Sequence, residues 1–442
     1  MNLVMIGTGY VGLTTGVGFA TLGHKVACVD IDASKIARLD LGEVPFYEPG
    51  LQEALKQVQS SGNIMFTTDL ESVIGQADII VLAVGTPPKS TGEADLSALF
   101  AASQQIGFCL DHEAVIVVKS TVPVGTNRKV LAHIRKTMQE KNREELSGLI
   151  NIVSVPEFLR EGTALQDFLV SDRIVIGADD AIAASTIDRL HEGIKAVRLV
   201  TTIESAELIK YAANAFLATK ISFINEMANL ADRVGADVRD IAQGIGLDHR
   251  IGPHFLNAGI GYGGSCFPKD VSALEQLSGH NGYSFKLLSA VIEVNNRQRD
   301  SFFKRLVDEL GDVKGRRIAV WGLAFKPDTD DVRESAAIEI AQRLCAQGAE
   351  IAAYDPKAME NAKRVLSDTV IFAPTAMDAA SGADALVVLT QWPEFKEVSF
   401  KTLRDQMVEP HIFDGRNYLA DLHLEQLGFI YRGVGLGRYD AS

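Results

Sequence analysis

The chain has 442 residues, of which 47% are hydrophobic and 23% charged, and its formal net charge is −14. This length predicts two or three domains with large cores, and the composition is that of a globular protein rather than a disordered or membrane-spanning one. The acidic balance argues against nucleic-acid binding through the overall field, so an anionic ligand would need local Arg, Lys or helix N-termini.

The N-terminus begins directly with a strand-like run, without the features of a signal peptide, and no apolar run approaches membrane-span length. The four cysteines are scattered and form no Cys-x-x-Cys pair, so neither a disulfide framework nor a metal site is expected. These features predict a cytoplasmic protein that does not bind a membrane.

The first elements form a strand, a glycine turn, a helix and a second strand. The strand Asn2–Ile6 precedes Gly7, a helix is expected over Tyr10–Leu22, and the strand Lys25–Val29 ends at Asp30. Further strands are predicted at Ile79–Val84, Ala114–Val118, Ile150–Val155 and Ile174–Gly177. The alternation of strands and helices predicts an α/β domain with a doubly wound parallel sheet.

From Thr201 the pattern changes to a long helix. Residues Glu204–Val234 contain neither Pro nor Gly and predict one helix of roughly 45 Å, long enough to connect two domains. A second α/β unit follows, with predicted elements at Arg317–Trp321, Ser335–Gln347, Glu350–Tyr354, Ala385–Leu389 and His411–Phe413. We therefore expect an N-terminal domain over residues 1–200, a central helical region over 201–300 and a C-terminal domain over 301–442.

Gly7, Gly9 and Gly12 form Gly-x-Gly-x-x-Gly between the first strand and helix. The first glycine allows a tight turn, the second lets the backbone meet a pyrophosphate, and the third lets helix and strand pack closely. Asp30 ends the next strand, where an acid accepts bonds from both ribose hydroxyls and repels a 2′-phosphate. The pattern predicts a site for NAD rather than NADP; a glycine turn without a ligand is the alternative.

Cys266 lies in Gly261–Asp270, between a run of glycines and a Lys-Asp pair. Its thiolate would be the strongest side-chain nucleophile. The settings of Cys28, Cys109 and Cys345 favour core packing instead. A dinucleotide site together with a nucleophilic cysteine suggests oxidation of an aldehyde to an acid through a hemithioacetal and a thioester.

Several polar residues could assist such a thiol. Lys210 and Asn214 lie four residues apart on the long helix and could hold a developing oxyanion, although a solvated helix face has the same spacing. Asp270 could orient a base or a water molecule, and Thr121 follows a strand at the ligand edge of the sheet.

Two acids follow the strand Ile150–Val155. Pro156 could begin a helical turn that Gly162 ends, which would place Glu157 and Glu161 on one side. One of them could act as a base or hold water, whereas a pair of exposed acids is the alternative.

With these motifs assembled, the chain resembles the UDP-glucose/GDP-mannose dehydrogenase family over nearly its whole length. The resemblance rests on several long motifs in the same order, namely Gly7–Leu13, Lys119–Gly125, Pro156–Gly162, Glu207–Asn214, Arg250–Asp270, Phe325–Ser335 and Phe413–Asn417.

The resemblance implies two Rossmann-like domains joined by a long central helix. It also implies a four-electron oxidation in which UDP-glucose becomes UDP-glucuronate while two NAD are reduced in turn. NAD would bind the first domain, UDP-glucose would lie between the two, and a homodimer would form through the central helical region.

By the same resemblance, Cys266 would hold the sugar aldehyde and the thioester. Lys210 and Asn214 would hold the C6 oxygen, and Asp270 would support water and proton transfers. Thr121 and Glu157 would share a water-holding or acid/base task whose division stays open, as do the parts of Glu161 and Asp270.

The resemblance also implies two sets of ligand contacts and no metal. The NAD contacts expected are Gly7, Gly9, Tyr10, Val11, Gly12, Asp30, Lys35, Thr86, Thr121, Glu161, Lys269 and Arg333. The substrate contacts expected are Glu157, Phe158, Leu159, Arg160, Lys210, Asn214, Arg250, Phe255, Leu256, Asn257, Gly259, Gly263, Lys326 and Arg416. Among these, Arg250 would reach the site of the partner subunit.

Three other functions have to be weighed. A sister enzyme acting on GDP-mannose or a UDP-N-acetyl-hexosamine would use the same chemistry with another base and sugar cradle. A two-electron hydroxyacid-type dehydrogenase would not need Cys266. A non-catalytic sensor of nucleotide sugars would not need the set Lys210, Asn214, Cys266 and Asp270.

Overall fold

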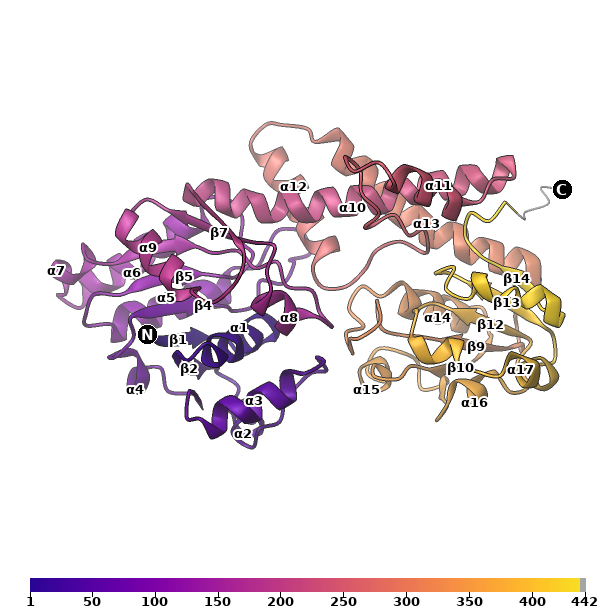
Figure 1. The fold of residues 1–442 in the computed structure, drawn as a ribbon, viewed down its shortest axis with the longest axis horizontal. Coiled ribbons are helices and arrows are strands. Elements are labelled where there is room, and N and C mark those ends of the chain that lie inside the picture. The colour runs from indigo at the N-terminus through magenta and orange to yellow at the C-terminus, as the bar shows by residue number, and fades with distance from the viewer. Residues whose placement is uncertain (438–442) are drawn as a thin grey trace. The chain divides into compact units, whose positions relative to one another are not determined.

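The computed structural model describes residues 1–437. The chain divides into two compact units, one of residues Met1–Ala213 and one from Asn214 onward. They are called unit 1 and unit 2, and Figure 1 shows their elements.

Unit 1 is built on an eight-stranded sheet with the order β3-β2-β1-β4-β5-β6-β7-β8. The strands are β1 (Asn2–Ile6), β2 (Lys25–Val29), β3 (Ile64–Thr67), β4 (Ile79–Leu82), β5 (Val115–Val118), β6 (Asn151–Ser154), β7 (Arg173–Ala178) and β8 (Val197–Thr201). All neighbouring strands are parallel except β6 and β7, which are antiparallel.

Both faces of this sheet are covered. In β1, Leu3 and Met5 belong to one buried cluster, whereas Val4 and Ile6 belong to another on the opposite face. Successive side chains of a strand point to opposite faces, so a continuous apolar strand requires helices on both sides. The helices of unit 1 are α1 (Tyr10–Thr21), α2 (Ala33–Asp40), α3 (Leu51–Ser60), α4 (Glu71–Ile74), α5 (Ser97–Cys109), α6 (Thr126–Glu140), α7 (Glu144–Ser147), α8 (Ala164–Leu169) and α9 (Ala181–Leu190).

Unit 2 contains a six-stranded parallel sheet with the order β11-β10-β9-β12-β13-β14. The strands are β9 (Arg317–Trp321), β10 (Glu350–Tyr354), β11 (Ile371–Phe372), β12 (Ala385–Val388), β13 (His411–Asp414) and β14 (Ile430–Arg432). The helices are α11 (Val238–Gly246), α12 (Phe267–His280), α13 (Lys286–Leu310), α14 (Ala336–Ala346), α15 (Met359–Ala362), α16 (Ala376–Ala380) and α17 (Phe400–Gln406), with 3₁₀ turns at Pro393–Lys396, Ala420–Leu422 and Leu424–Leu427.

One helix carries the chain from the first unit to the second. Helix α10 covers Ile203–Val234 without interruption, and Gly235, with φ of 75°, follows its end. The second part of α10 packs with α13 and the strands of unit 2 in one buried cluster, to which Ile224, Phe302 and Val320 belong. The predicted central helix and the Rossmann-like α/β class are thus confirmed.

Two local predictions were wrong. The strand at 173–178 runs antiparallel to β6 rather than parallel, so β7 and β8 form a reversed edge of the sheet. The segment after β6 contains no helical turn, because helix α8 begins only at Ala164. Glu157 therefore lies outside any helix or strand and is buried, while Glu161 is half-buried in the following turn.

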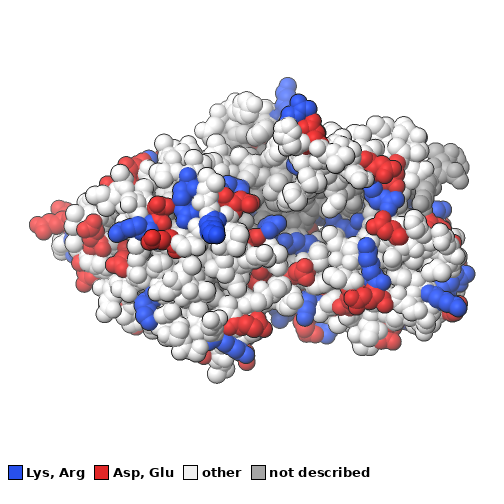
Figure 2. Space-filling view, in the orientation of Figure 1, with Lys and Arg blue, Asp and Glu red and all other residues white. Residues whose placement is uncertain are grey.

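No helix in residues 1–437 has the length and apolar character needed to cross a membrane. On the face drawn in Figure 2, basic and acidic side chains are interspersed.

Candidate active site

The glycine turn after β1 begins the site in unit 1. Gly7 has φ of 100°, and a Cβ there would come within 2.7 Å of the Ala83 carbonyl oxygen. A Cβ on Gly9 would meet no atom within 4 Å. Helix α1 begins at Tyr10, and Gly9, the N-cap residue, makes no side-chain hydrogen bond to the N–H groups of the first turn. Such a turn fits a diphosphate bound by backbone amides and the helix dipole.

Asp30 lies at the end of β2 and faces this turn. It accepts hydrogen bonds from the Thr8 backbone N–H at 2.9 Å, the Thr8 hydroxyl at 2.7 Å and Lys35 Nζ at 2.8 Å. Burial alone would raise the pKa of Asp30, but the bonds from Lys35 and Thr8 outweigh it and lower the pKa to about 2. The carboxylate is therefore charged near neutral pH, as ribose recognition requires.

The second sheet has a similar glycine turn and acid, but there the acid is fully buried. Gly322, after β9, has φ of 88°, as Gly7 does after β1. Asp355 follows β10 as Asp30 follows β2, yet it is fully buried and accepts bonds from the Leu323 N–H at 2.7 Å and from Trp392 Nε1 at 3.0 Å. This acid stabilises its own turn, so the structure offers a dinucleotide ribose no place there like the one beside Asp30.

Glu157 and Lys210 form a buried ion pair in unit 1. Lys210 Nζ lies 3.1 Å from Glu157 Oε1, and both side chains are at most 6% exposed. The second carboxylate oxygen accepts the Leu159 N–H at 2.6 Å, and Lys210 Nζ lies 5.5 Å from the centre of the Phe158 ring. Removing either charge would leave its partner buried and uncompensated, which costs on the order of 3–5 kcal/mol.

The remaining unit 1 residues expected at the site are placed as follows. The Thr86 hydroxyl donates to the Thr121 carbonyl at 2.9 Å, which joins the segments that follow β4 and β5. Arg160 is exposed and ion-paired with Asp167 at 2.6 Å. Glu161 is half-buried in the turn before α8. The structure thus brings Glu157, Phe158 and Lys210 together, while the Arg160 guanidinium is bound to Asp167.

Cys266 is the N-cap residue of α12, and its carbonyl accepts the Asp270 N–H at 2.8 Å. The Cys266 Sγ lies 3.7 Å from the Ser265 hydroxyl. Its position at the start of a 14-residue helix exposes it to the positive end of the helix dipole, which favours an anion.

Asp270 is the most buried polar group of this region, with 1% of the residue exposed. One oxygen accepts Asn214 Nδ2 at 2.6 Å, and the other accepts Lys269 Nζ at 2.5 Å. Asp270 therefore links the thiol-bearing helix to α10, on which Lys210 lies one turn before Asn214. Lys269, expected near NAD, is bound to this carboxylate.

The segment before Cys266 was expected to cradle the substrate. Leu256 and Gly259 are buried, Phe255 and Gly263 are half-buried, and Asn257 is exposed. A Cβ on Gly259 would come within 2.7 Å of the Gly415 carbonyl oxygen. The missing side chain at Gly259 therefore lets two backbone segments of the protein come close together.

Four cations were expected to offer positive charge to the ligands. The exposed side chains of Arg250 and Arg333 form ion pairs with Asp248 at 2.5 Å and with Asp331 at 2.7 Å. Exposed pairs of this kind stabilise little and exchange partners readily. Lys326 Nζ lies 5.5 Å from the centre of the Phe325 ring.

Arg416 behaves differently, because its guanidinium holds three backbone carbonyls. It donates to Leu389 at 2.9 Å, to Gly261 at 3.0 Å and to Phe325 at 3.3 Å. In this structure Arg416 therefore joins three loops of unit 2, in addition to any contact with a ligand.

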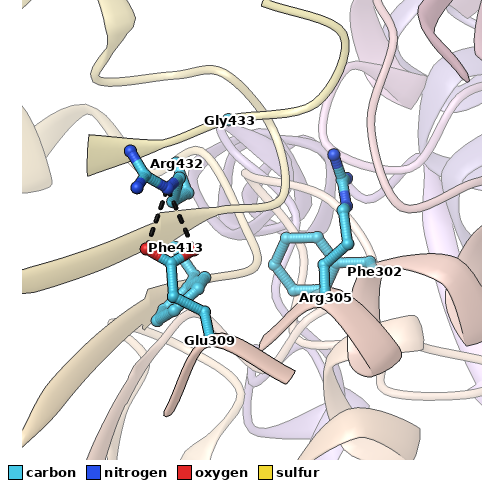
Figure 3. A pocket seen from close by; sticks show the side chains of 6 residues that line it. All are labelled: Phe302, Arg305, Glu309, Phe413, Arg432 and Gly433. Carbon is cyan, nitrogen blue, oxygen red and sulfur yellow. Dashed lines mark hydrogen bonds and ion pairs between the residues drawn. The ribbon is translucent and has the colours of Figure 1, made fainter. Parts of the chain in front are cut away.

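A separate small pocket in unit 2 contains none of the expected residues (Figure 3). It is lined by Phe302, Arg305, Glu309, Phe413, Arg432 and Gly433. Arg432 is paired with Glu309 at 2.8 Å, and Arg305 with Asp232 at 2.7 Å. Because both guanidinium groups are neutralised by carboxylates, this pocket has no net charge to offer an anion.

Sequence reasoning missed two groups near these sites. Lys119 is buried at the end of β5, and Glu207 is buried on α10. Both lie inside motifs used for the resemblance, Lys119–Gly125 and Glu207–Asn214, but neither received a role. One signal in the sequence was available for both residues. Each is a charged residue that adjoins apolar core residues at the strand or helix period, and such a position indicates a buried charge.

The donor set fits a dinucleotide in unit 1, where Gly9 leaves open space, the first turn of α1 offers amides and Asp30 is charged. Within residues 1–437, no group of three or more His, Cys, Asp or Glu side chains could hold a metal ion.

Three family models match the chain. Residues 1–195 match the NAD binding domain of the UDP-glucose/GDP-mannose dehydrogenase family, residues 204–297 its central domain, and residues 319–421 its UDP binding domain.

Relatives and solved structures agree with these matches. The chain is 48% identical over 434 residues to the UDP-glucose 6-dehydrogenase TuaD of Bacillus subtilis, covering 98% of this chain and 93% of that protein. A UDP-glucose dehydrogenase structure from Pyrobaculum islandicum superposes with a TM-score of 0.90 at 39% identity, covering 98% and 97% of the two chains. A UDP-D-ManNAc dehydrogenase structure from Pyrococcus horikoshii superposes with a TM-score of 0.87 at 28% identity, covering 99% and 100%.

Proposed function

The chain belongs to the UDP-glucose/GDP-mannose dehydrogenase family and carries its NAD binding domain, and from that premise we propose that it oxidises UDP-glucose to UDP-glucuronate, reducing two NAD, through covalent intermediates on Cys266. The observation that carries this proposal is the linkage around Asp270. This buried carboxylate lies one helical turn from Cys266 and is bound to Asn214 of α10.

The thiol divides the oxidation into two steps. When bound in unit 1, NAD would supply the acceptor for one hydride from C6 in each step. After the first oxidation, Cys266 Sγ adds to the C6 aldehyde and forms a hemithioacetal. Loss of the second hydride leaves a thioester, which water cleaves to the carboxylate and the free thiol. The helix N-terminus at Cys266 favours the sulfur anion in both addition and release.

Lys210 and Asn214 project from adjacent turns of α10 and would hold the C6 oxygen as its negative charge develops. The buried partners of these groups keep them in place, with Glu157 bonded to Lys210 and Asp270 bonded to Asn214. Asp270 would also hold the water that attacks the thioester. Glu157 and Thr121 would support proton transfer at the edge of the sheet, and their division of labour stays open.

The proposal assigns NAD to residues 1–200 and the UDP-sugar to residues 301–442 and the segment before Cys266. Residues 201–300 would form the centre of a homodimer in which Arg250 reaches the partner's site. On α10, Phe216, Phe223 and Leu230 recur at seven-residue intervals and are 67%, 52% and 50% exposed, which supports an apolar contact stripe. We place the enzyme in the cytoplasm.

The stoichiometry of the reaction tests the proposal most directly. With limiting UDP-glucose and excess NAD, we expect two NADH per UDP-glucose and no turnover of GDP-mannose or a UDP-N-acetyl-hexosamine. One NADH per sugar would contradict the four-electron reaction. Two NADH from another sugar nucleotide alone would keep the mechanism and overturn the substrate; the higher identity to UDP-glucose dehydrogenases than to the UDP-D-ManNAc enzyme favours UDP-glucose.

A serine in place of the thiol tests the covalent step. Cys266→Ser should still bind UDP-glucose but lose overall turnover by about three orders of magnitude or more, because a hydroxyl is a far weaker nucleophile near neutral pH. Calorimetric binding and NADH production measure the two effects. Cys109→Ser, at the end of α5, is the matched control and should stay within about twofold of the parent. A fast Cys266→Ser enzyme would rule out the thioester route.

A further inference from the structure

Residues 259–265, called the cysteine loop, are held by buried polar side chains of unit 2. The Gly259 N–H donates to Asn225 Oδ1 at 2.9 Å, and its carbonyl accepts Gln298 Nε2 at 2.8 Å. The Gly261 carbonyl accepts Arg416 Nη1 at 3.0 Å. A loop that leads directly to the nucleophile is thus ordered by side chains that lie outside it.

Asn295 of α13 makes the most specific of these contacts. Its Oδ1 accepts the Tyr262 N–H at 2.8 Å, and its Nδ2 donates to the Tyr262 carbonyl at 3.2 Å. One side-chain amide therefore satisfies both backbone groups of Tyr262, as a neighbouring strand would. Arg299, one turn along α13, donates to the same carbonyl at 2.9 Å.

The glycines of the loop permit this approach. A Cβ on Gly261 would come within 2.5 Å of Asn295 Oδ1, and Gly261 has φ of 89°. A Cβ on Gly264 would come within 2.6 Å of the Phe325 ring. These two glycines let the backbone of the cysteine loop lie against α13 and Phe325. They therefore help to hold the cysteine loop in place.

Three of the polar groups that hold the loop lie on one face of α13. Asn295, Gln298 and Arg299 are at most 8% exposed and follow the i, i+3, i+4 spacing of one helix face, on which Leu288, Val291 and Phe302 are also buried. Polar side chains are buried at a cost unless they are hydrogen-bonded. The hydrogen bonds to the carbonyl and N–H groups of the cysteine loop therefore explain why these three polar side chains are buried among apolar neighbours.

We propose that Asn295 is a positioning residue for Cys266: its amide fixes the backbone at Tyr262 and thereby the place of the thiol four residues later. This inference rests on the proposed function for its effect on turnover, but the clamp itself is a property of the protein alone. Misplacing a reacting atom by about 1 Å can cost about a hundredfold in rate.

Asn295→Ala removes both bonds to Tyr262. We expect kcat for UDP-glucose to fall by about tenfold to a hundredfold, while the KM for NAD changes less than about twofold because the NAD site belongs to unit 1. Amide hydrogen exchange of the segment 262–266 should accelerate, whereas exchange in the strands of unit 1 should not change.

Asn296→Ala is the matched control, since it makes the same chemical change at the next, exposed position of α13. It should leave kcat and exchange at their parental values. If Asn295→Ala behaves like Asn296→Ala in both measurements, the clamp has no positioning role and the proposal is overturned.

Asn295→Asp is a second variant in case the alanine variant does not fold. It keeps the acceptor for the Tyr262 N–H but puts a buried carboxylate oxygen in place of the donor, beside the Tyr262 carbonyl and Arg299, so kcat should fall by about twofold or more. Parental kcat and exchange in this variant would also contradict the proposal. Failure of the parental enzyme to yield two NADH would refute the proposed function alone, because the exchange comparison does not depend on turnover.

Discussion

Lys119 shows how burial sets the charge of a single residue in unit 1. It is 6% exposed at the carboxyl end of β5. Burial is the main reason that the pKa of Lys119 is lowered to about 8; the charge of Lys210 acts in the same direction, and Glu157 opposes both. Lys119, Lys210 and Glu157 therefore interact electrostatically in unit 1, and Lys119 is close to losing its proton at slightly alkaline pH.

The lowered pKa predicts how stability depends on pH. Between about pH 8 and the ordinary lysine pKa near 10.5, the unfolded chain binds a proton that the folded chain lacks, so folding gains stability as pH rises. Below pH 8 the buried ammonium carries its full cost. Lys119→Met removes this cost, so its advantage in free energy of unfolding over the parent should be larger at pH 7 than at pH 9.5.

Urea unfolding of both proteins at the two pH values measures this difference. Lys136→Met, an exposed position on α6, is the control and should show the same difference from the parent at pH 7 and pH 9.5. A pH-independent difference for Lys119→Met would mean that the Lys119 pKa is not lowered.

At the scale of elements, α10 is held at its N-terminal part by Glu207. The carboxylate accepts the Gly125 N–H at 2.6 Å, the Asn127 N–H at 2.8 Å and Asn127 Nδ2 at 2.6 Å. It thus caps α6, whose own N-cap residue is a glycine, and it lies one turn before Lys210 on α10. The loop after Thr121 and the helix that carries Lys210 are joined through this one side chain.

Glu207→Gln tests this connection. A glutamine offers only one acceptor oxygen and turns an NH₂ group toward a buried donor, so at least one N–H loses its partner. We expect a loss of about 1–3 kcal/mol in free energy of unfolding, measured in urea, and a lower kcat because the position of Lys210 is less well fixed.

Glu204→Gln provides the control one turn earlier on the same helix. Glu204 binds Arg128 at 2.8 Å in an exposed ion pair, and the Glu204 side chain is 42% exposed. The change should therefore lower the free energy of unfolding by less than about 1 kcal/mol. Equal effects of the two variants would show that Glu207 has no special part in placing α10.

At the scale of the whole molecule, two sheets with similar first turns have different tasks. The Asp30 side chain is 10% exposed, whereas Asp355 is fully buried and bonded to Trp392. The two sheets thus repeat the strand, glycine turn and acid, and the proposed dinucleotide site uses the first copy. Assembly is a further property at this scale, because the exposed stripe Phe216, Phe223 and Leu230 on α10 supports the proposed dimer.

Phe223→Glu should disrupt such a dimer. A charge in the middle of the stripe would be desolvated on association, so the dissociation constant should rise about tenfold or more. Light scattering coupled to gel filtration measures the mass, and kcat should fall in parallel if Arg250 completes the partner's site. Ile182→Glu, at an exposed apolar position of α9, is the control and should change neither.

The sequence by itself determined the local elements and suggested the chemistry that is proposed for the candidate site. The strands Asn2–Ile6, Lys25–Val29, Arg317–Trp321 and Glu350–Tyr354 were predicted to the residue, and the helix Glu204–Val234 to within one. Apolar period, glycine and the absence of proline are local signals, so they can be read without knowledge of the fold. The roles of Cys266, Lys210, Asn214 and Asp270 stay proposals that these motifs raised.

Only the tertiary structure decided which groups meet. It showed β7 reversed, Glu157 paired with Lys210, Asp355 bonded to Trp392, and the glycines before Cys266 packed against Asn295 and Phe325. Each outcome depends on partners tens of residues or more apart in sequence. Burial and hydrogen bonding between such partners are set by packing, and no local pattern records them.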